Sequence, residues 1–197
     1  MKALANRVGN MLLHPMTEWQ VIKDESATYK DVLFRYVAVL AVIPPAASIA
    51  GRYILDRKIS DSVIQSTFGY IVLTNLLWYC MYVLNVVIAG AVITAIVTTP
   101  ESRWSGLQGF KIAAYSFTPF YVAGLIAVFP YMGWILYVAI FYSIFLLYQG
   151  IIFLLSARRR RAAAYAIASF LSAAVIVSVM NLFEYVLETF VTSRMPL

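Results

Sequence analysis

Uncharged stretches alternate with short clusters of charged residues along the whole chain. The uncharged windows are residues 36–51, 62–100, 112–157 and 162–183. Because a helix needs about 20 apolar residues to cross a bilayer, the first window is short, the second and fourth suit one helix each, and the third suits two. Residues 129–134 (FPYMGW), near the middle of the third window, predict a tight turn. We therefore predict an all-α, polytopic membrane protein with five transmembrane helices.

An amphipathic segment precedes the first predicted span. Its apolar residues recur at helical spacing, which predicts a short helix on the membrane surface: Leu4, Val8, Met11 and Leu12. Pro15 restarts the chain, and Trp19 is an aromatic residue suited to the headgroup zone. The charged residues that follow form either a solvated lead-in or a docking surface. We divide the chain into an interfacial segment, 1–31, on the cytoplasmic side and a five-helix transmembrane domain, 32–197.

Interruptions and polar side chains mark the first two predicted spans. Pro44 and Pro45 lie at the centre of the first, where the missing N–H groups must bend or break the helix. Asn75 and Asn85 lie within the second, and each needs a hydrogen-bond partner where water is absent. We expect both asparagines to join neighbouring helices.

The distribution of basic residues predicts the orientation. Four consecutive arginines separate the fourth and fifth predicted spans: Arg158, Arg159, Arg160 and Arg161. Short loops rich in Lys and Arg stay in the cytoplasm, so this basic loop is expected there. Alternation then puts the amino terminus inside, the polar loop 101–111 inside and the carboxyl terminus outside. Most of the 15 Lys and Arg residues fall on the cytoplasmic side in this arrangement.

Composition agrees with a membrane protein and limits its chemistry. The chain is 62% hydrophobic and 12% charged, far from the values of soluble domains. Its net charge of +6 is better explained by anionic lipid headgroups beside the basic loop than by nucleic acid. With one histidine, His14, and one cysteine, Cys80, neither a metal site nor a catalytic triad is expected. We expect no cofactor and no enzymatic activity.

A candidate polar pocket lies at the proline interruptions. Pro119 falls near the middle of the third span and frees the carbonyl of Tyr115, which Ser116 or Thr118 can satisfy. Two interrupted helices at similar depth can form a polar site at the midplane. The residues of this candidate pocket are Tyr115, Ser116, Thr118, Pro119, Pro44, Pro45 and Asn85. The alternative is that the prolines only kink helices to shape a bundle.

Two motifs resemble the YIP family, the Ypt/Rab-interacting membrane proteins, and in particular its bacterial branch. Pro15, Trp19 and Ile22 are similar to the Pro-x-x-x-Trp-x-x-Ile lead-in of bacterial members. Residues 115–119 (YSFTP) are similar to the Gly-Tyr-Ser-x-x-Pro motif, with Ala114 in place of the glycine. The eukaryotic Asp-Leu-Tyr-Gly-Pro motif is absent. The resemblance implies a five-span fold with a cytoplasmic amino terminus and a location in the membrane, more than it implies an activity.

The combined prediction is a non-enzymatic protein of the bacterial cytoplasmic membrane. We expect it to act in membrane organisation or as an interaction scaffold, and to self-associate; its partner protein is not readable. The alternative is a small transporter or channel with a midplane site at the broken first and third helices.

Overall fold

A computed structural model describes residues 2–56, 61–97, 106–129, 132, 134–155 and 159–194. Within these residues the fold is all-α, as predicted, without strands. Four helical stretches are long and apolar enough to cross a membrane: Tyr29–Gly51, Ile71–Ile96, Trp134–Leu155 and Arg159–Phe183. The predicted all-helical membrane architecture is thereby confirmed with four such stretches.

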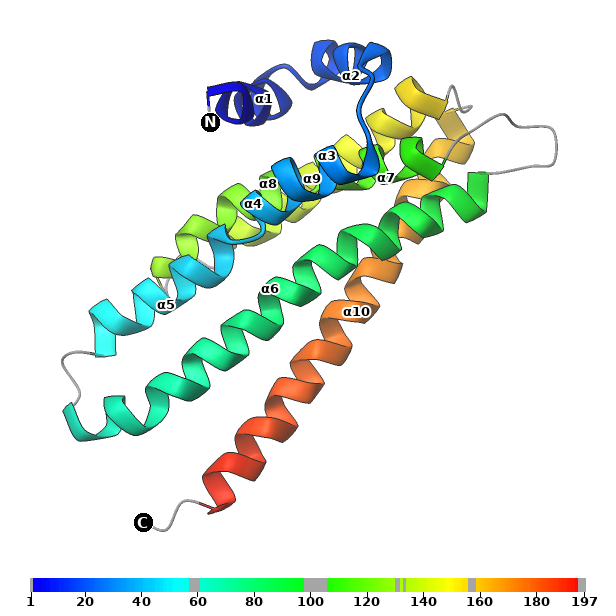
Figure 1. The fold of residues 1–197 in the computed structure, drawn as a ribbon. Helices are drawn as coiled ribbons and strands as arrows, with labels where there is room; N and C mark the ends of the chain where they lie inside the picture. Colours follow the sequence, from blue (N-terminus) through cyan, green and yellow to red (C-terminus); the bar gives the residue numbers. More distant parts are fainter. Residues whose placement is uncertain are drawn as a thin grey trace.

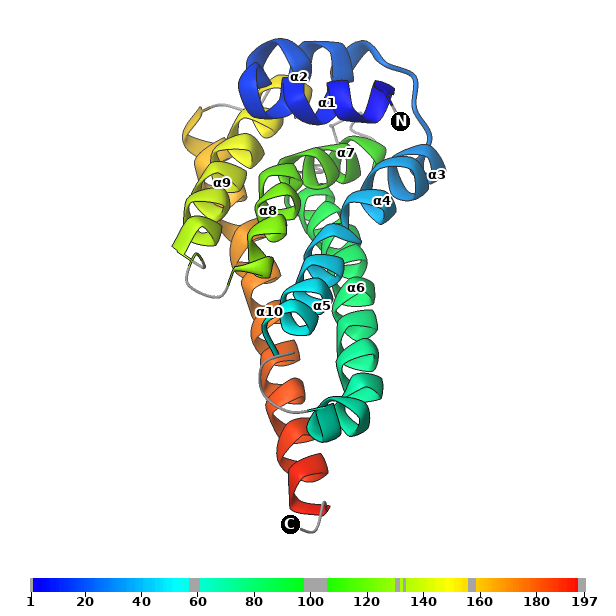
Figure 2. The same ribbon diagram turned by 90° about the vertical axis from the view of Figure 1, so that its left-hand side faces the viewer.

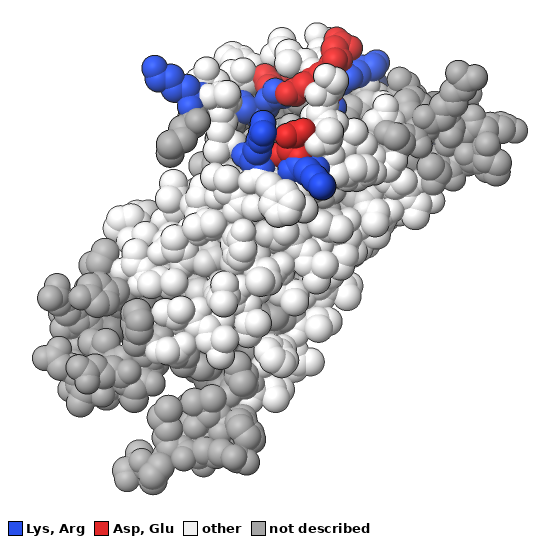
Figure 3. Space-filling view, in the orientation of Figure 1, with Lys and Arg blue, Asp and Glu red and all other residues white. Residues whose placement is uncertain are grey.

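A helical hairpin forms a layer over one end of the bundle (Figures 1 and 2). It consists of α1 (Lys2–Leu13) and α2 (Pro15–Asp24). Pro15 occupies the first turn of α2, where its missing N–H costs nothing. The predicted helix before Pro15 is therefore present. Figure 3 shows that charged side chains on this face gather over the hairpin and the start of the next helix, while the body of the bundle is uncharged.

The first membrane-length stretch is built from four short pieces. They are α3 (Tyr29–Val32), the π-helix η1 (Leu33–Val37), α4 (Ala38–Leu40) and α5 (Ile43–Asp56). The helix breaks at residues 41–42, and Pro44 and Pro45 then lie in the first turn of α5. The predicted interruption is confirmed. The π-helix one turn earlier has no counterpart in the sequence prediction.

The remaining helices complete the bundle. These are α6 (Asp61–Val97), α7 (Gly106–Ser116), α8 (Thr118–Ala123), the 3-10 helix η2 (Gly124–Val128), α9 (Trp134–Leu155) and α10 (Arg159–Arg194). Helices α6 and α10 are the longest, and they pack against each other (Figure 1). The basic segment differs from the predicted loop, because Arg159, Arg160 and Arg161 form the exposed first turn of α10. Arg158 lies outside the described residues.

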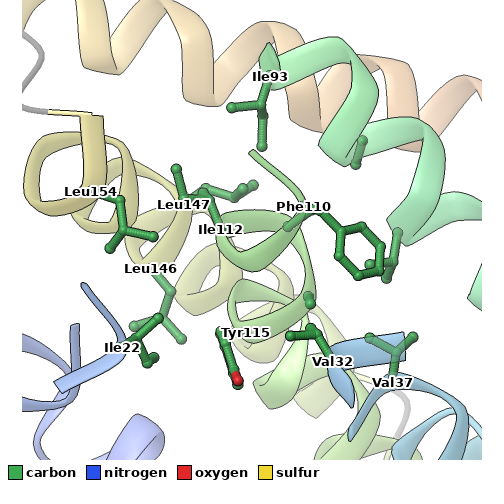
Figure 4. Close-up of a cluster of buried hydrophobic side chains, with 14 of the residues drawn as sticks. Ile22, Val32, Val37, Ile93, Phe110, Ile112, Tyr115, Leu146, Leu147 and Leu154 are labelled. Atoms are coloured by element: carbon green, nitrogen blue, oxygen red, sulfur yellow. The ribbon is translucent and has the colours of Figure 1, made fainter. Parts of the chain in front are cut away.

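The core lies where the hairpin, the first stretch, α7 and α9 meet. Figure 4 shows side chains from α2, α6, α7 and α9 converging there, among them Ile22, Ile93, Ile112 and Leu146, all with no exposed surface. Helix α7 approaches α6 closely because two glycines face each other. A Cβ built on Gly109 would lie 2.8 Å from the carbonyl oxygen of Gly90. Apolar side chains on the outer faces of α9 and α10, such as Phe141 and Leu171, are exposed, and in a membrane they would contact lipid.

Candidate functional site

The two interrupted stretches meet at a buried hydrogen-bonded triad. The Thr118 hydroxyl donates to the Tyr115 carbonyl at 2.6 Å, and the Tyr36 and Thr118 hydroxyl oxygens lie 2.7 Å apart. Because the single Thr118 hydrogen is used on Tyr115, Tyr36 must donate to Thr118. All three residues are at most 5% exposed. The triad thus links the π-helix of the first stretch to the break between α7 and α8.

Pro119 explains why this triad forms. Proline has no N–H, so it cannot bond to the Tyr115 carbonyl one turn earlier. The Thr118 side chain replaces that lost bond, as one of the two options predicted from the sequence. Ser116, the other option, is fully buried, and its hydroxyl has no partner within the described part of the chain.

Pro44, just after the break of the first stretch, also packs closely against the second interrupted stretch. A Cβ built on Gly124, in η2, would lie 2.5 Å from Cγ of Pro44 and 3.0 Å from its Cα. Only a glycine permits this approach. Pro44 and Pro45 are both buried. Pro44 of α5 thus packs against η2, five residues beyond Pro119.

A network of charged side chains joins the two helices of the hairpin, close to Tyr115 of the triad. The Arg7 guanidinium contacts Glu18 at 3.0 Å and Glu25 at 2.8 Å, and Asn10 donates to Glu18 at 2.9 Å. The same guanidinium lies 5.6 Å from the centre of the Tyr115 ring. Glu18 is only 5% exposed. A carboxylate buried to this degree depends on its paired cation, so the network is a specific contact between α1 and α2.

Lys111 anchors the end of α2. Its ammonium donates to the carbonyl oxygens of Ile22 at 3.1 Å and Glu25 at 2.6 Å. Ile22 lies in the last turn of α2 and Glu25 is its C-cap residue. Carbonyls at this end of a helix lack partners within the helix, and a cation there is favourable. The sequence prediction placed Lys111 at the edge of a polar loop. That was wrong, because residue 106 already begins α7 and Lys111 is 6% exposed.

Trp19 is buried where α2 meets α7 and α9. Its side chain has no exposed surface, so it packs inside the protein and does not contact the surroundings. The ring packs edge-on to Tyr115, with centroids 6.4 Å apart, and fills the space beside Gly150 of α9. Tyr142 of α9 completes the docking by donating to the Leu12 carbonyl at 2.8 Å. Pro15, Trp19 and Ile22 therefore place the hairpin on α7 and α9.

Asn85 lies apart from the triad. Its amide donates to the Ala173 carbonyl at 3.3 Å and so joins α6 to α10, as predicted. Asn75, for which a similar role was expected, instead donates to Ile71 within its own helix at 2.8 Å. The seven residues of the candidate pocket thus fall into two places. Tyr115, Ser116, Thr118, Pro119, Pro44 and Pro45 surround the paired breaks, and Asn85 lines a groove beside α10.

Four residues of this region were not found from the sequence: Arg7, Glu18, Tyr36 and Lys111. The eleven-residue separation of Arg7 and Glu18 across Pro15 would suggest a pair only if a helical hairpin were assumed. Tyr36 looks like any apolar position of a span, and only the π-helix brings it to Thr118. The position of Lys111 could have indicated a specific role, because it is a single cation directly before an apolar window.

Comparison with known proteins gives consistent results. A family model described as the Yip1 domain matches residues 9–180. The inner membrane protein YohC of Escherichia coli K12 is 28% identical over 151 residues, which cover 74% of this chain and 77% of the relative. The protein of the same name from Escherichia coli O6:H1 matches with the same figures. No solved structure matches the chain significantly.

Proposed function

This chain belongs to the Yip1 domain family, and from that membership we propose that it is a non-enzymatic membrane scaffold. In this role it binds other proteins, or further copies of itself, and organises the surrounding bilayer. The family membership was predicted from the lead-in motif and from residues 115–119, and it is confirmed.

The predicted location is also confirmed. The relative from Escherichia coli is an inner membrane protein, and this chain has four helical stretches of membrane length. The chain is therefore a multi-pass protein of the bacterial cytoplasmic membrane.

The observation that supports a scaffold over a transporter is the packing between the paired breaks. A transport path at this depth would need space and hydrated polar groups. Tyr36, Tyr115 and Thr118 instead bond to one another with at most 5% exposure. Pro44 fills the space above Gly124. The interrupted helices serve here as a rigid joint.

We further propose five crossings, with α7, α8 and η2 together forming the remaining one. Residues 106–128 are interrupted, so they contain no single long helix. Their combined length is about 34 Å at 1.5 Å per residue, enough for the hydrocarbon core. The amino terminus would then lie in the cytoplasm and the carboxyl terminus outside. The location of α1 and the end of α10 at opposite ends of the molecule supports this proposal (Figure 2).

The cytoplasmic face would carry the surfaces that meet partners. Exposed Arg159, Arg160 and Arg161 lie at the start of α10, beside Arg158 in sequence, and suit anionic lipid headgroups. The docked hairpin adds a fixed polar surface at the same end of the bundle (Figure 3).

Reconstitution into liposomes tests the scaffold against the transporter. We expect crosslinkable oligomers or co-purified proteins, and no protein-dependent flux of protons, potassium or small organic solutes. Flux that is lost on substitution of Tyr115 or Asn85, but kept on substitution of Asn75, would favour the transporter. Asn75 is a suitable control because it is an intramembrane asparagine that bonds within its own helix.

A further inference from the structure

The turn of the hairpin, between α1 and α2, lies beside the middle of α9. Tyr142 is the ninth of the 22 residues of α9, and its hydroxyl donates to the Leu12 carbonyl at 2.8 Å. Trp19, further along α2, packs beside Gly150. In Figure 2, α9 lies on the side of the molecule away from the amino terminus. The hairpin therefore follows the second half of α9, with its turn toward the middle of that helix.

This position places the turn within the depth that α9 crosses. The 13 residues that follow Tyr142 in α9 extend about 20 Å at 1.5 Å per residue, and the Tyr142 side chain covers only part of that distance. All 22 residues of α9 together are about as long as the hydrocarbon core is thick. The Leu12 carbonyl therefore lies below the end of α9 and not beyond it.

The side chains next to the turn are apolar and face outward. Leu13 is 75% exposed and Met16 is 54% exposed. Phe141, the neighbour of Tyr142 on α9, is 72% exposed. The rest of the apolar face of α1 is covered by the protein, because Met11 has no exposed surface. Leu13 and Met16 thus extend the exposed apolar surface of α9 onto the hairpin.

The backbone at the centre of the turn is bonded within the protein. The His14 N–H donates to the Asn10 carbonyl at 2.7 Å. The His14 carbonyl accepts from the Glu18 N–H at 3.1 Å and from the Thr17 hydroxyl at 2.8 Å. Pro15 follows and has no N–H. A turn in contact with lipid requires such partners, because there is no water to supply them.

The charged residues of the hairpin lie away from the turn. Residues 8–17 contain no Lys, Arg, Asp or Glu. Arg7 and Glu18, which flank this segment, pair with each other at 3.0 Å. Lys2 and Lys23, close to the other ends of α1 and α2, are exposed. The hairpin is therefore polar at its base and apolar at its turn, as expected of a segment that enters a bilayer from one side.

We propose that the turn of the hairpin, residues 12–16, is inserted among the acyl chains of the adjacent leaflet, where Leu13 and Met16 contact lipid. The charged base of the hairpin lies at the level of the headgroups. The hairpin is thereby held by the bilayer as well as by α7 and α9. The proposal rests on α9 as a membrane crossing and not on the scaffold role.

Spin labels on single cysteines test this insertion. The natural cysteine, Cys80, is replaced by serine, and the full chain is labelled at Leu13→Cys or Met16→Cys and reconstituted into phosphatidylcholine and phosphatidylglycerol vesicles. Collisions are measured with oxygen, which concentrates in acyl chains, and with a water-soluble nickel chelate. Phe141→Cys is the lipid control and Lys23→Cys the water control. All four labelled positions are exposed, so no label displaces a buried side chain.

We expect the labels at positions 13 and 16 to collide more often with oxygen than with nickel, as at position 141, and the label at position 23 to show the reverse. More collisions with nickel at 13 and 16 would place the turn in water and overturn the proposal. Protection from both reagents would mean that a protein covers the turn, which would also overturn it. A nickel-accessible label at position 141 would show instead that α9 is misplaced, and the inserted turn would be rejected with it.

Discussion

At the scale of single residues, the most consequential feature is a buried pair of charges between the two helices of the hairpin. The Arg7 side chain is 19% exposed and that of Glu18 is 7% exposed, at 3.0 Å from each other. Such a pair contributes little more to the stability of the fold than an apolar contact of similar size would. Removing one member is costly, however, because it leaves the other charge buried alone. The pair therefore specifies how α1 and α2 dock.

Arg7→Met should release the hairpin. Loss of the cation from a buried pair costs about 3–5 kcal/mol, and that cost falls on the docked state. We expect faster tryptic cleavage after Lys23, measured in detergent. Arg35→Met is the matched control, because Arg35 pairs with Asp31 at 3.5 Å on the surface with 84% of its side chain exposed. Equal cleavage rates in the two variants would contradict a role for Arg7 in docking.

Thr118→Val should destabilise the joint between the two interrupted stretches. The substitution keeps the side-chain shape but leaves the Tyr115 carbonyl and the Tyr36 hydroxyl without their partner. Each unmet group costs about 1–3 kcal/mol, so the melting temperature in detergent should fall clearly.

Ser116→Ala is the control for Thr118→Val. Ser116 is equally buried, yet its hydroxyl bonds to no described residue. Its removal should leave the melting temperature unchanged or slightly raise it. A larger loss from Ser116→Ala than from Thr118→Val would mean that the triad is not the main polar contact at this depth.

At the scale of elements, glycines decide how closely helices approach. Gly150 of α9 faces the indole of Trp19, and a Cβ there would lie 2.8 Å from two ring atoms. Gly9 of α1 has nothing within 4 Å of a built Cβ. The two positions therefore offer the same substitution in a crowded and in an open site.

Gly150→Ala should push α2 away from α9, because the added methyl group would overlap the Trp19 ring. Overpacking of this kind destabilises a folded protein by about 1–3 kcal/mol. We expect the Trp19 contribution to the fluorescence spectrum, defined by subtraction of Trp19→Phe, to move to longer wavelength. Gly9→Ala should leave it in place. An unchanged Trp19 spectrum in Gly150→Ala would show that the hairpin does not rest on α9 in this way.

Much at the element scale could be predicted from the sequence, and the exceptions have physical causes. Pro44 and Pro119 act through the backbone alone, so the interruptions they cause are visible in the sequence. The π-helix at 33–37 is not, because no residue type specifies one. Trp19 could face either lipid or core by its chemistry, and only Gly150, far away in the sequence, decides for the core.

At the scale of the whole molecule, membrane-length windows and the family could be predicted, but the hairpin's docking could not. The docking depends on contacts between residues distant in the sequence, such as Lys111 with the end of α2 and Tyr142 with Leu12. The candidate pocket stays a prediction, and its seven residues do not all lie together. Its proline-linked members are adjacent in depth, whereas Asn85 faces another helix.

The number of crossings follows from whether the interrupted residues 106–128 pass through the bilayer. Five crossings separate the two termini, and four would keep them on the same side. The fold therefore makes a prediction about sidedness that does not depend on the activity of the protein.

Reporter fusions in bacterial cells measure this sidedness most directly. A fluorescent protein that matures only in the cytoplasm should be bright at the amino terminus and at residue 160, and dark at residue 197. A phosphatase active only outside should show the reverse pattern. A bright fluorescent fusion at residue 197, or an active phosphatase at residue 160, would contradict five crossings with a cytoplasmic hairpin.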